Sequence, residues 1–218
     1  MKNIYEICGE QIPFQLTQIP GPPKKLYVMG VLPKPSTKII CIIGSRKYSS
    51  YGEEVTKKLI SGLKGYDICI VSGLAIGIDG IAHRAAMDAG LTTIAFPGSG
   101  LNSDVIYPRQ HTDLANDIVL SGGALISEFR PDQHAFRWTF PVRNRLMAGM
   151  SEALVVIEAG EKSGTLITSR LALDYNKNIG AVPGDIFSPL SMETNKLIRN
   201  GATPITCSED ILEILGLC

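Results

Sequence analysis

The chain alternates short, uninterrupted runs of apolar residues with amphipathic stretches, and each of five such runs ends in a glycine. These runs cover residues 38–44, 67–73, 92–98, 153–160 and 178–184. A continuous apolar run of this length is typical of a parallel strand buried on both faces, with helices as the crossovers. The alternation therefore predicts an α/β fold: an extended, Rossmann-like, doubly wound and mostly parallel sheet with helices on both faces.

The intervening stretches complete this prediction. Two further short strands are expected to start at Ile118 and at Ala124. Helical spacing of apolar residues predicts helices over residues 51–63, 79–89, 143–150, 165–175, 193–199 and 208–215.

Three segments are expected along the 218 residues. Residues 1–37 are rich in Pro and Gly and predict an extended lead-in with one short strand at 26–28. Residues 38–206 form the Rossmann-like domain, and residues 207–218 form a short C-terminal helix.

Composition limits the classes of function. The chain has 21 Lys+Arg against 21 Asp+Glu, which argues against a polycation held to nucleic acid or membrane by bulk charge. A local basic site stays possible. The five cysteines include no CxxC pair, and Cys41 and Cys69 lie in apolar runs, so we expect buried thiols and no zinc or disulfide framework. With no secretory signal and no run long enough to span a bilayer, a cytoplasmic protein is expected.

The strand ends lack the common nucleotide motifs. A dinucleotide site needs GxGxxG after the first strand, whereas this strand ends in GSRKYSSYG at residues 44–52. There is also no Walker A sequence. We therefore expect no cofactor.

Two strand ends favour phosphate binding instead. In the GSR turn, Gly44 allows a tight turn, Ser45 offers a hydroxyl and a backbone N–H, and Arg46 offers a charged fork. Alternatively, Arg46 is an ordinary solvated residue. The second candidate is the start of a helix at Lys162, Ser163, Gly164 and Thr165, where backbone N–H groups and the helix dipole favour an anion. The hydroxyls alone are also explained by a plain helix cap.

The third candidate is residues 129–149, where arginines alternate with aromatic rings. Cations that hold phosphates, interleaved with rings that stack on bases, suit single-stranded nucleic acid. Alternatively, each of these rings packs in the hydrophobic core and does not contact a base. The residues concerned are Arg130, Arg137, Arg143 and Arg145, with Phe129, Phe136, Trp138 and Phe140.

Two weaker constellations are candidates for catalysis. His83 lies four residues after Asp79 on a predicted helix, which favours a structural hydrogen bond over a catalytic dyad. Glu128 and Glu158 both follow predicted strands, but no motif connects them as a carboxylate pair.

Taken together, several motifs closely resemble the DNA-processing protein family DprA/Smf. The resemblance runs in order from about Leu26 to the C-terminus. It is carried by GSR, SGLAIGIDGIAHRAA, GSGLNSDVIYP, GGALISEF, FPVRNRLMAGMSEALVVIEAGEKSGTLIT, AVPGD and TNKLIRNGA.

This resemblance implies an extended Rossmann fold that binds single-stranded DNA without catalysis. It also implies a homodimer that protects incoming DNA and loads the recombinase RecA during natural transformation. The resemblance assigns DNA contacts to Arg46, Arg137, Phe140, Arg143, Asn144 and Arg145, with Lys162, Ser163 and Gly164 completing the phosphate surface and Phe140 stacking on a base. Neither the N-terminal helical domain nor the C-terminal winged helix of many members fits within this sequence.

Two other functions on the same scaffold stay open from the sequence. One is a phosphoribohydrolase-like enzyme. Its PGGxGT-type loop is missing, and only the partly similar sequences PGSG at Pro97 and EKSGT at Glu161 occur. The other is a sensor that holds a small nucleotide in the same pocket.

Overall fold

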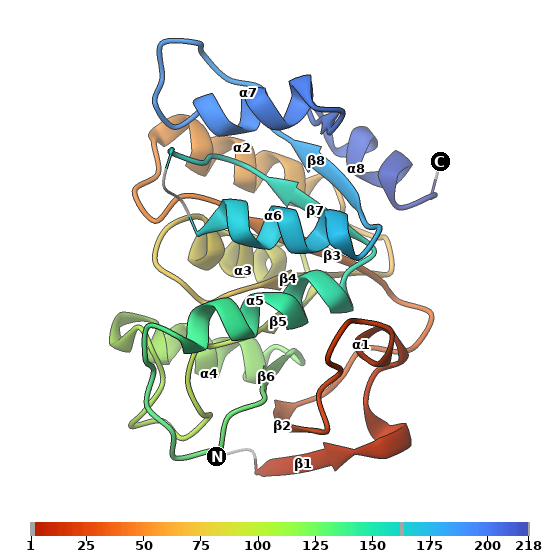
Figure 1. Cartoon of the computed structure of the whole chain (residues 1–218), viewed down its shortest axis with the longest axis vertical. Helices are drawn as coiled ribbons and strands as arrows, with labels where there is room; N and C mark the ends of the chain where they lie inside the picture. Colours follow the sequence, from red (N-terminus) through yellow and green to blue (C-terminus); the bar gives the residue numbers. More distant parts are fainter. Residues whose placement is uncertain (1–2, 162–163, 218) are drawn as a thin grey trace.

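The computed structural model describes residues 3–161 and 164–217. In this described part nine strands form one twisted sheet (Figure 1). From one edge to the other, the strands are β1 (Ile4–Cys8), β2 (Lys25–Gly30), β6 (Ala124–Ser127), β5 (Thr92–Ala95), β4 (Ile68–Ser72), β3 (Lys38–Ile43), β7 (Ala153–Val156), β8 (Asn178–Ala181) and β9 (Thr203–Pro204).

The sheet is parallel from β6 to β9, and only its first two pairings, β1 with β2 and β2 with β6, are antiparallel. The central register sets Ile40 beside Ala153 and Ile43 beside Val156, which aligns the ends of β3 and β7. The mostly parallel, Rossmann-like sheet predicted from the apolar runs is confirmed.

Helices cover both faces of the sheet, as predicted. On one face, α1 (Phe14–Thr17), α5 (Thr139–Met150) and α6 (Thr165–Asp174) contribute side chains to one apolar cluster, and α7 (Met192–Arg199) packs against it. On the other face lie α2 (Ser50–Ser61), α3 (Ile78–Asp88), α4 (Thr112–Leu120) and α8 (Ser208–Ile214). Figure 1 shows α5 and α6 in front of the sheet and β1 at the end opposite α7 and α8.

The direction of winding changes at β3. After β3 the chain adds β4, β5 and β6 on one side, and it then returns through α5 to add β7, β8 and β9 on the other side. The carboxyl ends of β3 and β7 therefore diverge into loops that lead to opposite faces. In open α/β sheets this is where ligands bind.

One predicted strand is wrong. The stretch that begins at Ile118 is the last turn of α4, whose buried side chains Leu114, Ala115, Ile118 and Val119 recur at helical spacing. The strand expected from Ala124 is confirmed as β6. In the first 37 residues, the expected short strand is β2, and it is accompanied by β1 and α1, which were not expected. The division at residues 37 and 206 stays a prediction.

Cys41 and Cys69 are fully buried, as predicted, and burial raises the pKa of both thiols. Within residues 3–161 and 164–217, no helix is long and apolar enough to cross a membrane.

Candidate nucleic-acid interface

A pocket of about 680 Å³ opens at the carboxyl ends of β3 and β7. Its walls come from the loop after β3, the start of α3, the amino-terminal half of α5 and the start of α6. The residues that line it are Ile43, Gly44, Ser45, Arg46, Lys47, Ala75, Asp79, Phe140, Arg143, Asn144, Met147, Gly160, Glu161, Gly164, Thr165, Thr168 and Leu190. The pocket thus joins residues from all three stretches singled out in the sequence.

The GSR turn is held rigidly while its cation is exposed. The Ser45 hydroxyl donates to the Lys47 carbonyl at 2.7 Å and accepts the Lys47 N–H at 3.1 Å. Ile78 N–H donates to the Ser45 carbonyl at 3.2 Å. Ser45 is buried and its hydroxyl is engaged within the turn, whereas Arg46 and Lys47 are exposed. The turn therefore presents two cations on a braced backbone.

Gly77 makes this bracing possible. Its φ of +92° is in the region that favours glycine, and a Cβ at this position would overlap the carbonyl oxygen of Ser45. Gly77 precedes α3 directly. Because Gly77 lies so close to Ser45, the start of α3 packs directly against the GSR turn.

An aromatic ring lies directly beside Arg46. The guanidinium carbon of Arg46 is 5.6 Å from the centroid of the Phe140 ring, a cation–π distance. Tyr107 packs against the same ring with centroids 5.6 Å apart and planes tilted by 58°. A Cβ on Gly98 would lie 2.5 Å from the Phe140 ring, so this glycine leaves the space that the ring needs. Phe140 is thus held between three neighbours at the pocket wall.

The start of α6 also faces the pocket. Gly164 is the residue before the helix, and the Thr165 hydroxyl donates to the Gly44 carbonyl at 3.3 Å. This contact ties the α6 terminus to the GSR turn across the ends of β7 and β3. Lys162 and Ser163, predicted as phosphate contacts, lie outside the described residues.

Arg143 lines the pocket but is only 5% exposed. Its Nη1 donates to the carbonyls of Gly73 and Phe96, which follow β4 and β5. Asp79 faces it across Gly73 and accepts the N–H groups of Gly73 and Ala75 at 3.1 and 3.4 Å. Arg143 thus joins two strand ends to α5.

Burial is the main cause of the pKa shifts of Asp79 and Arg143. It raises the pKa of the Asp79 carboxyl above its ordinary value, and the positive charge of Arg143 partly opposes that shift. Burial likewise lowers the pKa of Arg143 to about 10. Both side chains are buried, so water screens their charges little.

The remaining predicted residues, on α5 and just before it, divide between the pocket and other surfaces. Asn144 is buried and lines the pocket. Arg145 instead forms an ion pair with Glu128 at 2.5 Å and donates to the Gly21 carbonyl at 2.9 Å. Arg137 is exposed just before α5 and is absent from the pocket lining.

The weaker constellations take structural roles. The His83 ring bonds to Thr93 Oγ1 at 2.7 Å, so the partner of His83 is Thr93 and not Asp79. Glu128 and Glu158 have separate partners, since Glu158 accepts from the backbone N–H of Ser49 at 3.0 Å and from its hydroxyl. No group of metal-ligating side chains is found among the described residues.

Glu158 fills an unexpected position, at the amino end of α2. Ser49 caps this helix, with its hydroxyl accepting the Gly52 N–H at 3.1 Å. The buried carboxylate of Glu158 bonds to Ser49, and a Cβ on Gly52 would overlap it. In a dinucleotide-binding Rossmann fold, the first helix receives the pyrophosphate at this terminus. Here a side chain of the protein supplies the anion.

Two residues beside the contact of Arg46 with Phe140 have no role predicted from the sequence: Lys47, which lines the pocket, and Tyr107, which packs against Phe140. Lys47 adjoins Arg46, and Tyr107 belongs to the stretch GSGLNSDVIYP, which contributed to the resemblance but was given no function. The signal available for Tyr107 was an aromatic residue in a long loop after a strand, which by itself predicts nothing specific.

Comparisons with known proteins agree with this architecture. The sequence is 40% identical to the protein Smf of Escherichia coli over 95% of this chain, and the match spans 55% of that protein's length. The structure resembles DNA processing protein A from Streptococcus pneumoniae with a TM-score of 0.88, at 35% identity, covering 97% of this chain and 74% of the other.

A second solved structure covers nearly the same length. It is DNA processing protein A from Helicobacter pylori, described for its single-stranded DNA binding mode, with a TM-score of 0.84 and 29% identity over 99% of this chain and 98% of the other. The family described as DNA recombination-mediator protein A matches residues 3–216. By its sequence and by its fold, this chain belongs to that family, the DprA/Smf proteins.

Proposed function

We propose that this chain is a recombination mediator that binds single-stranded DNA in the pocket at the ends of β3 and β7. The observation that carries the proposal is the convergence of Arg46, Phe140 and the start of α6 on one pocket of an otherwise neutral protein. A related chain from Helicobacter pylori is described as binding single-stranded DNA, which supports the same ligand class here.

The proposed mechanism divides the work among these groups. Arg46 and Lys47 attract phosphates from the braced turn, and the N–H groups at the start of α6 donate hydrogen bonds to a further phosphate oxygen. Phe140 provides a ring face for a base once Arg46 moves from the ring to a phosphate. A duplex keeps its bases stacked inside, so this ring favours a single strand. Lys162 and Ser163 are proposed to extend the phosphate contacts.

The other predicted residues, on α5 and just before it, are proposed to have two kinds of role. Asn144 is proposed to contact the strand in the pocket, and Arg137 to hold a phosphate beside it. Arg143 and Arg145 are proposed to shape the interface, because both are engaged with other parts of the protein.

We further propose that the protein acts as a homodimer in the cytoplasm, by binding and not by catalysis. Its proposed cellular role is to protect incoming DNA and to load RecA in natural transformation. Purified protein should speed RecA assembly on single-stranded DNA, and incubation with nucleoside monophosphates should release no base. Sedimentation at several concentrations would test the dimer.

The binding site itself is tested by a salt titration with Arg46→Ala. For four cations at the interface, Arg46, Lys47, Arg137 and Lys162, the logarithm of affinity should fall with the logarithm of salt at a slope of about −3. Arg46→Ala should weaken single-strand binding about tenfold and reduce the steepness of that slope by about 0.7. Lys64→Ala is the matched control, because it removes an exposed cation before β4, at the opposite end of the strands.

Two results would contradict the proposed site. One is equal affinity of the wild-type protein and Arg46→Ala at every salt concentration. The other is binding of duplex DNA as tight as that of single-stranded DNA. Parallel measurements with RNA of the same sequence would show whether the sugar is distinguished.

A further inference from the structure

A pair of exposed aromatic rings lies just outside the pocket. Phe136 and Trp138 are 52% and 57% exposed. Their planes are nearly parallel, at 4°, with centroids 6.3 Å apart. Two large rings in water are unfavourable for the monomer unless something covers them, and a stacked pair of rings that are each more than half exposed offers an outer ring face to a ligand.

This surface is anchored from within. Trp138 contacts the buried ring of Phe129 in a T-shaped arrangement, with centroids 5.7 Å apart and an angle of 84°. Phe129 is 7% exposed and therefore belongs to the core. In addition, the Thr139 hydroxyl accepts the Phe136 N–H at 3.2 Å and donates to the Phe136 carbonyl at 2.8 Å. The ring pair is thus held in a defined orientation.

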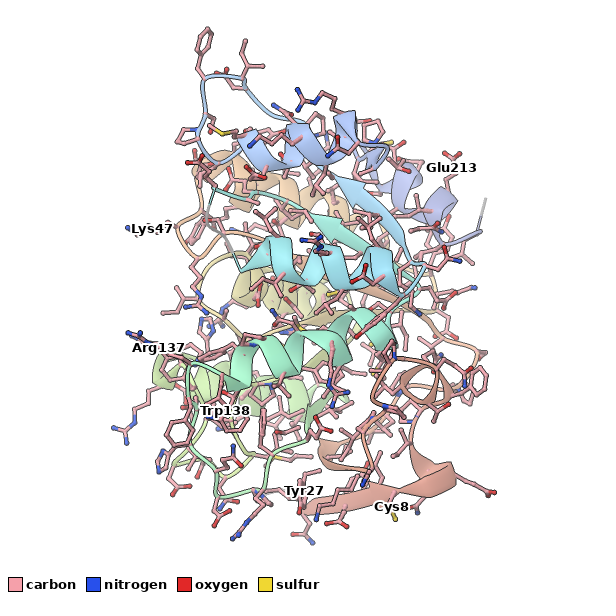
Figure 2. All side chains as sticks on the ribbon, viewed as in Figure 1. Cys8, Tyr27, Lys47, Arg137, Trp138 and Glu213 are labelled. Carbon is pink, nitrogen blue, oxygen red and sulfur yellow. The ribbon has the colours of Figure 1, made fainter. Side chains whose placement is uncertain are left out.

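The ring pair is also close to the pocket. Trp138 is the residue before α5, and Phe140 is two residues later, so their Cα atoms are at most about 7 Å apart. Arg137 lies between the two rings of the pair, Phe136 and Trp138, in sequence and is exposed. Figure 2 shows Lys47, Arg137 and Trp138 on the same side of the molecule, at the left of the view.

The charges around the rings suit a polyanion. Arg137 and Arg130 are both exposed, and Asp132 is the single acid between residues 129 and 145. Asp132 pairs with Arg130 at 3.1 Å, but both side chains are more than half exposed, so the pair is weak and easily exchanged for a phosphate. A hydrophobic protein partner would not require these cations, whereas a strand that leaves the pocket would.

From these observations we propose that Trp138 and Phe136 form a second base-stacking site for single-stranded DNA. This site takes bases of the same strand that occupies the pocket at Phe140, and Arg137, between the two rings of the pair in sequence, holds a phosphate beside them. The proposal rests on the proposed function and extends it. It assigns the strand a path from the GSR turn, across the start of α5, to the ring pair.

The chain contains one tryptophan, so Trp138 reports on its own environment. A base stacked on it quenches its fluorescence. Oligo(dT) of about 16 nucleotides, a length at the upper end of single-strand site sizes, is titrated while a fluorescent label on the DNA reports total binding. Tryptophan quenching is expected to rise in parallel with the label's anisotropy.

The variant test uses Trp138→Leu, which keeps an apolar contact for Phe129 but removes the flat ring. Affinity for the oligonucleotide should fall about 5- to 150-fold, the loss of one stacked base. Trp138→Phe should restore part of it. Tyr66→Ala removes an exposed ring before β4, at the opposite end of the strands, and should leave affinity unchanged. Unchanged urea unfolding of Trp138→Leu confirms that the fold is intact.

The outcomes separate the two proposals. If labelled DNA binds but tryptophan fluorescence and the affinity of Trp138→Leu do not change, the second stacking site is wrong and the pocket stands. If no single-stranded DNA binds at all, the proposed function itself fails. If Trp138→Leu binds DNA normally but no longer stimulates RecA, the rings contact a protein partner and the stacking site is refuted.

Discussion

Arg143 is expected to stabilise the fold, and its replacement by Met tests this against a direct role in DNA binding. The substitution keeps most of the apolar stem and removes the guanidinium that joins the Gly73 and Phe96 carbonyls. Each hydrogen bond with a charged partner contributes about 1.5–3 kcal/mol. Loss of the cation also leaves the buried Asp79 carboxylate without its compensating charge. Removing one member of such a buried group typically costs about 3–5 kcal/mol.

Urea unfolding measures this loss. With a slope of about 2 kcal/mol per molar urea, a destabilisation of about 4 kcal/mol lowers the midpoint by about 2 M. Arg46→Met is the matched control, because Arg46 is exposed, and its unfolding free energy should stay within about 0.5 kcal/mol of wild type. Adding Asp79→Asn to Arg143→Met should recover part of the loss.

The reasoning would be refuted if the free energy of unfolding of Arg143→Met lay within about 1 kcal/mol of that of the wild-type protein. If that variant were equally stable and also lost DNA affinity, Arg143 would be a direct DNA contact. The two arginines thus give opposite expectations: Arg46→Met lowers affinity at constant stability, and Arg143→Met lowers stability.

Two further predictions concern buried groups outside α5. Burial lowers the pKa of His83 to about 3, from an ordinary 6.5, so the folded state binds fewer protons than the unfolded state between these values. The contribution of neutral His83 to the free energy of unfolding is therefore fully present above pH 6.5. It is lost as pH falls, and the free energy of unfolding drops by about 1 kcal/mol between pH 7 and 5.5. His83→Gln should remove this dependence in urea unfolding at the two pH values, and an unchanged dependence would contradict the assignment. Glu158→Gln should lower the unfolding free energy by about 2–3 kcal/mol, because the charge-assisted bonds to Ser49 and the favourable position at the α2 terminus become neutral. Glu54→Gln changes an exposed carboxylate on the same helix and should have no measurable effect; equal behaviour of the two variants would argue against the Glu158 role.

Most of the parallel sheet could be predicted because its strands are buried on both faces and leave continuous apolar runs. β1 could not, since it is an edge strand with a mostly exposed pattern and pairs through its backbone. The mistaken strand at Ile118 has a different cause. A short apolar run fits a strand and a helix equally well, and the decisive residues, Leu114 and Ala115, lie one turn earlier.

The candidate site shows the same division. The GSR turn and the start of α6 could be placed because the carboxyl ends of parallel strands meet at one edge. The roles of the arginines on α5 could not, because they depend on which carbonyl or carboxylate each side chain reaches after folding. Arg143 bonds to carbonyls 70 and 47 residues away, and Arg145 pairs with Glu128, 17 residues away. Spacing along one helix carries no information about such partners.

The position of Glu158 has a consequence for competition among ligands. A cell contains abundant mononucleotides and dinucleotides, and the amino end of the first Rossmann helix is a natural place for their phosphates. With the Glu158 side chain there, such metabolites meet an occupied helix terminus in place of open N–H groups. We expect the amino end of α2 to bind no nucleotide phosphate, so a ligand of this fold has to take its phosphate contacts elsewhere, from the GSR turn and the start of α6.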